Sequence, residues 1–285
     1  MRTAIVTDTN SGIYEAEGRE LGVFVVPMPI IAGDETYYEG LTITRERFFE
    51  LLQSDTPVRT SQPAPGDVAA LWDRALEEYD ELVYIPMSGG LSGSVRSAGL
   101  LAEEYGGRVQ VADNRRISVT MRHSVLDAIT LAARGMGAVE IKRALEESAY
   151  DSTVFLGVES LLYLRRGGRI SPAAAAIGSI LNIKPLLVIR GEKIEPFATV
   201  RGTKNCRRRE LEEMHKTAQE YKAGGKRIRV GLAGSFAREE DAEPWKQMAA
   251  EVFPDEEIRY DPLSYSVCCH TGPDAFGIGV SVRCE

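Results

Sequence analysis

The sequence predicts an α/β protein of two domains, the first a Rossmann-like three-layer parallel sheet and the second a mixed sheet with helices. Short apolar runs rich in β-branched residues alternate with stretches of helical spacing through the first half of the chain. A hairpin signal, Arg190-Gly191 between two apolar runs, marks the second half. At 285 residues, the chain is long enough for two domains of ordinary size.

In the first half, strands and helices are expected to alternate. Thr3–Thr7 predicts a buried strand that ends in the polar turn Asp8–Gly12, and Leu21–Pro29 predicts a second strand. Two prolines exclude a helix from Thr60–Pro65. Further strands are expected over 82–85 and 109–112, and helices over 45–52, 67–79, 94–105, 120–134 and 138–150. This order implies a parallel sheet with helices on its faces.

In the second half, a strand over Thr153–Val158 starts a new set of elements. A short helix to Arg165, an Ala-rich helix around Pro172–Ile180 and a hairpin follow. The hairpin strands are expected over 184–189 and 192–200, later helices over 207–221 and 239–252, and later strands over 227–233, 257–260 and 277–282. A boundary near residue 150 gives domains 1–150 and 151–285, with a return of the last strand to the first domain left open.

The composition is that of a soluble globular protein, with 44% hydrophobic and 27% charged residues. The net charge of −8 disfavours general binding to a nucleic-acid backbone. The four cysteines have no zinc-site spacing, so we expect reduced structural thiols and neither a metal nor a cofactor. Since the N-terminus lacks a signal-peptide pattern and no apolar run approaches the length of a membrane span, a cytoplasmic protein is expected.

The glycine-rich turn Ser88–Ser94 is the first candidate binding segment, because it joins the end of a strand to the start of a helix. Glycines allow a ligand to approach the backbone closely, and a helix start offers unpaired amides that suit an anion. The spacing matches neither a nucleotide P-loop nor a dinucleotide fingerprint. A tight turn with Ser92 as a helix cap explains the segment equally well.

The second candidate is Thr60-Ser61-Gln62-Pro63, a rigid polar loop that presents several hydroxyls. Hydroxyls can donate to a carboxylate without the desolvation cost of a buried cation. On the residues alone, an ordinary surface turn is the simpler account.

The third candidate is Arg165–Ile170, where two glycines lie beside three arginines. A guanidinium matches a carboxylate or phosphate with two hydrogen bonds. A helix that ends in cations followed by a glycine stop explains Arg165, Arg166 and Gly167, but it leaves Arg169 unexplained.

The fourth candidate is His270, in Cys268–Pro273, which has the most turn-like context of the three histidines. It could donate to an anion or take part in proton transfer. A structural histidine with satisfied hydrogen bonds is the more frequent case.

Taken in order, these segments resemble the DegV family, which includes the fatty-acid-binding subunits of bacterial fatty acid kinase. The resemblance extends from Met1 to about Val282. Its motifs are Asp8-Thr9, Thr60-Ser61-Gln62-Pro63, Ser88 with Leu91-Ser92-Gly93-Ser94 and Ser97-Ala98, Leu161 and Leu164 through Gly167-Gly168-Arg169-Ile170, Leu181-Asn182-Ile183-Lys184-Pro185, Val200-Arg201-Gly202, and His270-Thr271-Gly272-Pro273. Two departures are Gly89, where a second serine is usual, and Thr120–His123, which replaces a glycine-containing stretch.

The resemblance implies that a long-chain fatty acid lies between the two domains, with its tail in an apolar tunnel. It implies that the carboxylate meets the hydroxyls of Thr60 and Ser92, with His270 nearby and Arg169 close to the head group and associated with the phosphorylated form. The neighbours of the two hydroxyls, Ser61 and Gly93, complete the expected ligand-binding set.

The resemblance also implies a partner, an ATP-dependent fatty acid kinase subunit that phosphorylates the bound acid, after which this chain holds the acyl-phosphate. Transient contact with a membrane is compatible with such a cargo. Arg201 is assigned to the head group or to kinase docking. The basic run Lys204–Arg209 is expected to be a solvated helix start, with kinase docking as the sharper hypothesis.

Without a complete catalytic set, the chain is expected to be a lipid-binding carrier rather than an enzyme. The alternative is a serine-dependent acyl-ester hydrolase or transferase, with Ser92 as nucleophile and His270 as base. Ser94 stands where the hydrolase elbow needs a glycine, and no carboxylate partner for His270 is evident. A module that binds another anionic or apolar ligand is a third hypothesis.

Overall fold

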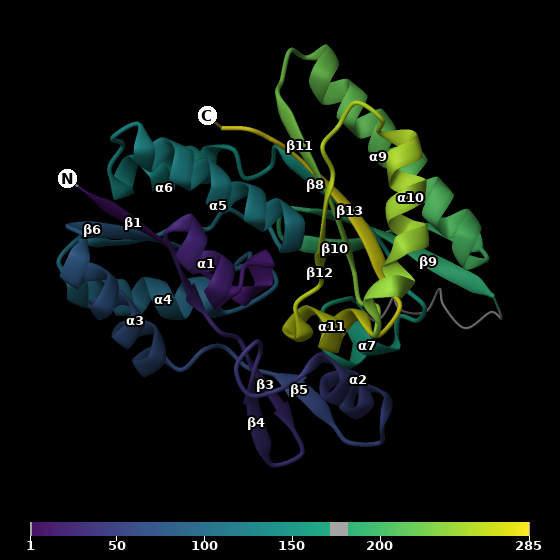
Figure 1. The fold of residues 1–285 in the computed structure, drawn as a ribbon, viewed down its shortest axis with the longest axis horizontal. Coiled ribbons are helices and arrows are strands. Elements are labelled where there is room, and N and C mark those ends of the chain that lie inside the picture. The colour runs from purple at the N-terminus through teal and green to yellow at the C-terminus, as the bar shows by residue number, and fades with distance from the viewer. Residues whose placement is uncertain (1, 172–181, 285) are drawn as a thin grey trace.

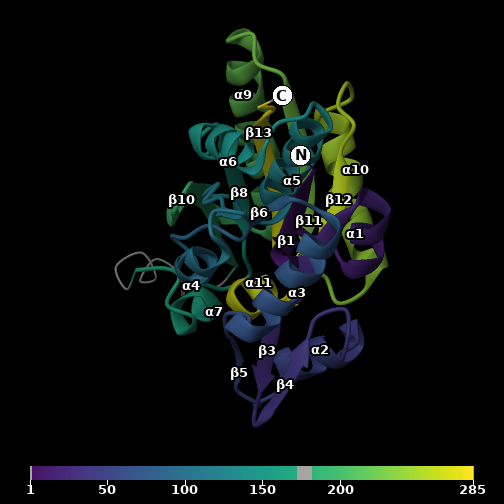
Figure 2. The same ribbon diagram turned by 90° about the vertical axis from the view of Figure 1, so that its left-hand side faces the viewer.

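The computed structural model describes residues 2–171 and 182–284, which fold into three sheets covered by helices (Figure 1). The Ala-rich helix expected around Pro172–Ile180 lies outside the described residues. Both termini lie at one end of the molecule, and the smallest sheet lies at the other end (Figures 1 and 2).

The first sheet is parallel throughout, with the strand order β2-β1-β6-β7. Its strands are β1 (Thr3–Asp8), β2 (Val23–Val26), β6 (Glu81–Ile85) and β7 (Val109–Val111). Successive residues of β1 serve opposite layers, because Ile5 shares a core with Val125 and Val6 shares one with Trp72. The helices of these layers are α3 (Pro65–Glu78), α4 (Ser94–Ala102), α5 (Ser118–Ala133) and α6 (Ala138–Glu147).

This arrangement confirms the predicted three-layer parallel domain. The order of the strands reverses between β1 and β6, which are neighbours in the sheet. In open α/β sheets, ligands bind outside the carboxyl ends of the strands at such a point. The turns that follow these two strands contain Thr9–Ser11 and Ser88–Gly93, so both lie at this edge.

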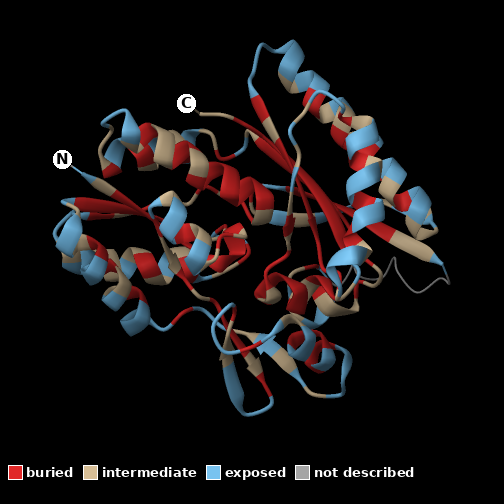
Figure 3. Cartoon of the chain, viewed as in Figure 1, coloured by how far each residue is buried: buried red, intermediate tan, exposed pale blue. Residues whose placement is uncertain are grey.

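The second sheet is mixed, with the order β10-β9-β8-β13-β11-β12 and one parallel pair, β11 with β12. Its strands are β8 (Ser152–Gly157), β9 (Ile183–Arg190), β10 (Lys193–Arg201), β11 (Ile228–Gly234), β12 (Arg259–Pro262) and β13 (Phe276–Val282). Phe155 and Val188 pack under α9 (Thr203–Ala223) and α10 (Glu243–Val252), whereas Val154 and Ile189 belong to a different core. The inner strands β8, β11 and β13 are almost continuously buried (Figure 3), whereas β10 at the edge is largely exposed.

A small antiparallel sheet of order β4-β3-β5 extends from the first domain. It consists of β3 (Pro29–Ala32), β4 (Glu35–Tyr38) and β5 (Val58–Thr60), with α2 (Arg45–Gln53) beside it. The short helices α7 (Leu162–Arg166) and α11 (Tyr265–Thr271) contact each other, and α11 also contacts β3 and β5. The end of β5 therefore meets the second half of the chain.

Helix α5 joins the two large sheets, because polar groups on it bond to strands of the second sheet. Asp127 pairs with Arg229 of β11, and His123 Nδ1 lies 2.7 Å from Ser281 Oγ of β13. Arg122 pairs with Glu17 of α1 (Glu15–Leu21) and lies 3.6 Å from Asp261 Oδ2 of β12. The sequence pattern, which reports apolar periodicity, did not reveal these contacts.

Three expectations about local structure were wrong. The run Leu21–Pro29 forms the end of α1, all of β2 and the first residue of β3. Gly22 ends α1 with a φ of 70°, Pro27 interrupts the strand, and the rest of α1 was not predicted. The segment around His270 is helical rather than a turn, since Ser264 accepts a hydrogen bond from Val267 N at 3.3 Å and caps α11.

The third error concerns the start of α4. This helix begins at Ser94 with Gly93 at the N-cap, so Ser92 is not the capping residue. Ser92 Oγ nevertheless accepts a hydrogen bond from Ser94 N at 3.2 Å. The hairpin at Gly191 was predicted correctly, because β9 and β10 pair antiparallel across it and Gly191 has a φ of 71°. The last strand, β13, pairs with β8 and β11 in the second sheet.

Candidate functional site

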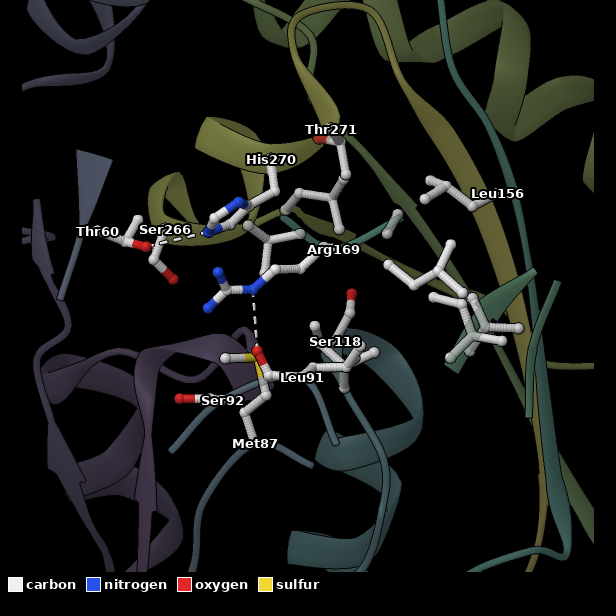
Figure 4. Close-up of a pocket in the computed structure, with 18 of the residues that line it drawn as sticks. Thr60, Met87, Leu91, Ser92, Ser118, Leu156, Arg169, Ser266, His270 and Thr271 are labelled. Atoms are coloured by element: carbon white, nitrogen blue, oxygen red, sulfur yellow. Dashed lines mark hydrogen bonds between the residues drawn. The ribbon is translucent and has the colours of Figure 1, made fainter. Parts of the chain in front are cut away.

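A cavity of about 330 Å³ lies where the first domain faces the second sheet (Figure 4). This volume is at the lower end of what small-molecule sites occupy. All six residues predicted for ligand binding line it: Thr60, Ser61, Ser92, Gly93, Arg169 and His270. They come from β5, from the turn before α4, from the segment after α7 and from α11.

The larger part of the cavity wall is apolar. The inner face of the second sheet contributes residues from five strands, because every second residue of a strand points to the same face. The apolar residues that line the cavity are Met28, Met87, Leu91, Ile117, Val119, Val154, Leu156, Leu164, Ile189, Ile194, Ala233, Leu263, Val267 and Ile278. Such a wall suits an extended hydrocarbon and offers it no hydrogen-bonding partner.

The polar end of the cavity is organised around a hydrogen bond between Thr60 Oγ1 and His270 Nε2, which are 3.0 Å apart (Figure 4). This bond joins β5 of the first domain to α11 of the second half of the chain. His270 Nδ1 is buried and has no hydrogen-bond partner among the described residues. The backbone of Gly167 lies against this ring, since a Cβ there would come within 2.1 Å of His270 Nδ1.

Burial, and then the positive charge of Arg169, lower the pKa of His270 from 6.5 to about 4. The imidazole is therefore neutral at physiological pH. A neutral ring can donate or accept one hydrogen bond at each nitrogen but adds no charge. The permanent positive charge at this end of the cavity comes from Arg169.

Backbone carbonyls fix the Arg169 side chain. Its Nε donates to the carbonyl of Leu91 at 3.1 Å, and its Nη1 donates to the carbonyl of Gly167 at 2.5 Å. A guanidinium has five N–H donors, so the remaining ones are available to a ligand. Figure 4 shows the guanidinium between His270 and Ser92, where it faces the polar end of the cavity.

The turn before α4 brings the second predicted hydroxyl to the same place. Ser92 Oγ lies 2.9 Å from Ser94 Oγ, and a Cβ on Gly93 would come within 2.3 Å of Gln62 Nε2. Gly93 therefore lies directly against the end of the Gln62 side chain, where the turn meets the Thr60 loop. Gln62 Oε1 accepts a hydrogen bond from Ser97, which fixes this loop from α4.

A wide, open depression adjoins the polar end. The two hollows share Leu91, Ser92, Gly93, Arg169 and Ile194 as lining residues. Arg169 thus borders both the inner cavity and the outer surface. The depression also carries the charged side chains of Arg96, Asp113, Arg165, Glu192, Lys193 and Glu195.

Three further residues, for which no role in binding was predicted from the sequence, lie at or beside the cavity. Asp8, at the end of β1, accepts hydrogen bonds from Asn10 N at 2.9 Å and from Met87 N at 3.1 Å, so it fixes two loops beside the cavity. Burial raises the pKa of Asp8 to about 6. Ser118 and Ser266 also line the cavity. Of these three, Asp8 alone had a signal in the sequence, because it follows a strand and belongs to the Asp8-Thr9 motif.

The remaining basic residues lie away from the cavity. Arg201 is exposed at the end of β10 and does not line it. In the run Lys204–Arg209, Arg209 pairs with Glu213 at 3.0 Å on the exposed face of α9, whereas Cys206 is buried. The guanidinium of Arg207 lies 5.0 Å from the centre of the Phe276 ring. A solvated helix start therefore describes only part of this run.

Within residues 2–171 and 182–284, no helix is long and apolar enough to cross a membrane, and no cluster of three or more metal-ligating side chains occurs. Ser92 and His270 have different partners, so the nucleophile–base contact that a serine hydrolase needs is not formed.

The fold and the site define a class: two α/β domains that enclose an apolar cavity ending in hydroxyls, an arginine and a neutral histidine. The family model described as the DegV family of uncharacterised proteins matches residues 2–283. The chain belongs to the DegV family. A DegV domain-containing protein of Deinococcus radiodurans is 32% identical over 282 residues, which are 98% of each chain.

Two solved structures show the same fold over the whole chain. The chain is similar to a fatty acid binding DegV family protein from Thermus thermophilus, with 32% identity, a TM-score of 0.87, and 99% of this chain and 100% of the other covered. It is also similar to DegV of Bacillus subtilis, described as a fatty acid binding protein, with 26% identity, a TM-score of 0.84 and the same coverage.

Proposed function

We propose that this protein binds one long-chain fatty acid in the cavity and presents it to a separate ATP-dependent kinase. The observation that carries the proposal is a single cavity whose apolar walls end at Thr60, Ser92, Arg169 and His270. An apolar tail with one acidic end fits such a cavity at both ends. The relatives from Thermus thermophilus and Bacillus subtilis, described as binding fatty acids, support the same ligand class.

In this proposal the tail supplies most of the affinity. Burial contributes about 0.8 kcal/mol per methylene, so a long chain contributes on the order of 10 kcal/mol before the costs of association. The carboxylate accepts hydrogen bonds from the hydroxyls of Thr60 and Ser92 and from the free N–H groups of Arg169. These contacts orient the acid so that its head lies next to the outer depression.

Arg169 has a second role in the kinase reaction. A carboxylate oxygen attacks the terminal phosphorus of ATP on the kinase, ADP leaves, and the acyl-phosphate remains in the cavity. The added phosphoryl group carries more negative charge than the acid, and a guanidinium that borders both hollows can stabilise it. His270 stays neutral and holds Thr60 in place.

Native mass spectrometry tests the ligand. Protein stripped of lipid is mixed with stearate and, separately, with methyl stearate, which has the same tail but no carboxylate. We expect one stearate per chain and about ten-fold weaker binding of the ester, because the ester cannot accept charge-assisted hydrogen bonds. A protein that takes up no fatty acid contradicts the proposal.

Arg169→Gln tests the kinase step. With a fatty acid kinase and ATP, we expect at least ten-fold slower formation of acyl-phosphate, while the affinity for stearate changes only a few-fold. Arg166→Gln is the matched control, because Arg166 is exposed at the end of α7 and lines neither hollow. If Arg169→Gln loses bound lipid altogether while Ser92→Ala retains all of it, the assigned roles are wrong.

A serine hydrolase has less support, because Ser92 Oγ pairs with Ser94 Oγ and His270 pairs with Thr60. Hydrolysis of a chromogenic long-chain ester that Ser92→Ala abolishes would instead favour that function.

A further inference from the structure

One polar side chain lies in the apolar part of the cavity, apart from the head-group residues. Ser118 is the first residue of α5 and lines the cavity between the buried residues Ile117 and Val119. Figure 4 shows its hydroxyl pointing into the cavity, on the opposite side of the Arg169 side chain from Thr60. Ser118 therefore lies on the wall beside the apolar residues and apart from the Thr60–His270 pair.

The Ser118 hydroxyl makes no hydrogen bond to another described residue. Two other hydroxyls of the cavity wall are bonded within the protein: Ser266 Oγ donates to Asn10 Oδ1, and Thr271 Oγ1 donates to the carbonyl of Gly272 at 3.2 Å. A hydroxyl that faces a pure hydrocarbon loses its hydrogen bonds to water and gains none, which is unfavourable. Ser118 is therefore a donor and acceptor without a partner from the protein.

The backbone at Ser118 strengthens the case. Its φ of 54° lies in the left-handed region, where a non-glycine residue is strained and where glycine would be relaxed. Strained residues of this kind concentrate at ligand sites, where the surrounding structure holds them in place. Glycine would relieve the strain at position 118, but it would also remove the hydroxyl from the cavity wall.

We propose that the preferred ligand is a long-chain fatty acid with a hydroxyl or keto oxygen near the middle of its chain, and that Ser118 is the residue that selects it. This inference depends on the proposed function and narrows its ligand class. The ligand oxygen would exchange a hydrogen bond with Ser118 Oγ, while the carboxylate remains at Thr60 and Ser92. The apolar wall on both sides of Ser118 would then bury the two hydrocarbon segments.

The test compares ligands on the full-length protein stripped of lipid. Stearate, stearate hydroxylated at mid-chain and stearate hydroxylated beside the carboxylate each displace a fluorescent fatty acid. One additional neutral hydrogen bond corresponds to about a five-fold difference in dissociation constant. We expect this advantage for the mid-chain hydroxyl only.

Ser118→Ala should abolish the preference and leave stearate bound at least as tightly as before. Thr130→Val is the matched control, because it removes a hydroxyl from the same helix outside the cavity and should keep the preference. Ser118→Gly, which suits the positive φ, provides the same test if Ser118→Ala does not fold.

Equal binding of stearate and its mid-chain hydroxyl derivative overturns the inference, and so does a preference that survives in Ser118→Ala. These outcomes leave the proposed function intact, because stearate still binds. If neither acid displaces the probe, the proposed function fails and the inference fails with it.

Discussion

The two ends of the cavity are built in different ways. The apolar end is one face of a regular sheet, where Val154, Leu156 and Ile189 repeat with the period of the strands. The polar end is assembled from a strand end, a glycine turn and a short helix, and its central hydrogen bond joins residues 210 positions apart. The affinity for a ligand therefore depends on the face of a regular sheet. Its orientation depends on a few polar groups whose positions relative to one another are set by separate segments.

The largest effect is expected from filling the apolar end. Ala233 is buried and lines the cavity, so Ala233→Phe should occupy the space of several methylenes and weaken stearate binding by more than 100-fold. Displacement of a fluorescent fatty acid by stearate measures this change in affinity. Ala198→Phe, on the α9 side of the same sheet, is the control and should bind normally. Normal binding by Ala233→Phe would mean that the tail lies elsewhere.

At the polar end, the strongest single change should be Gly167→Ala. Because the new Cβ would come within 2.1 Å of His270 Nδ1, the ring must move and release Thr60. Loss of the charge-assisted hydrogen bonding that Thr60 and its neighbours give the carboxylate costs about 2 kcal/mol, so the acid should bind about 30-fold more weakly. Calorimetric titration gives the value. Gly168→Ala is not a matched control, because Gly168 has a φ of 67°. Gly99→Ala, in α4 with open space around it, is suitable.

A smaller loss is expected from Thr60→Val, which keeps the shape of the side chain and removes its hydroxyl. The acid should bind about ten-fold more weakly, since a hydrogen bond to a charged group is lost. Methyl stearate should bind Thr60→Val and the parent protein equally. If the ester weakens as much as the acid, Thr60 contributes to packing rather than to recognition of the carboxylate.

The smallest effect on binding should be that of pH. With a pKa of about 4, His270 remains neutral from pH 6 to pH 8, so its titration should change stearate affinity less than two-fold over that range. Stability behaves differently. Because the folded pKa lies below the unfolded value of 6.5, the unfolded chain binds the proton first as the pH falls. About 3 kcal/mol should be lost between pH 6.5 and pH 4.

The measurement is the difference in unfolding free energy between the parent protein and His270→Gln across this range. The comparison is needed because burial raises the pKa of Asp8 to about 6 and that of Glu39 to about 7. The contributions of Asp8 and Glu39 have the opposite sign to that of His270. The stability that these two carboxyl groups contribute is fully present below pH 4 and is lost as the pH rises through 6 to 7. A difference that does not vary with pH would show that His270 is solvated.

The contrast between the two ends also explains what could be predicted from the sequence. The three-layer domain, the hairpin at Gly191 and the strand that begins near Thr153 follow from local periodicity and turn chemistry, and the structure confirms them. The strands that form the apolar end can be predicted in the same way, because the pattern of a single strand is contained in its own local sequence.

The polar end was reached mainly through the family resemblance. Sequence physics alone favoured a surface turn for Thr60 and a structural role for His270, and it placed His270 in a turn instead of α11. The local sequence around Thr60 does not indicate a contact with His270, since this contact depends on how β5 and α11 pack. Ser118 was missed for the same reason, because its strained φ is a property of the folded chain.

The charged groups on α5 have a consequence for dissecting the molecule. Asp127, Arg122 and His123 are buried, and each contacts a strand of the second sheet. In a fragment ending near residue 150, these side chains would lose their partners on the second sheet. The complementary fragment would expose the apolar face of that sheet to water. We expect that neither fragment folds when it is expressed alone. Co-expressed fragments should form a folded heterodimer with a single thermal unfolding transition.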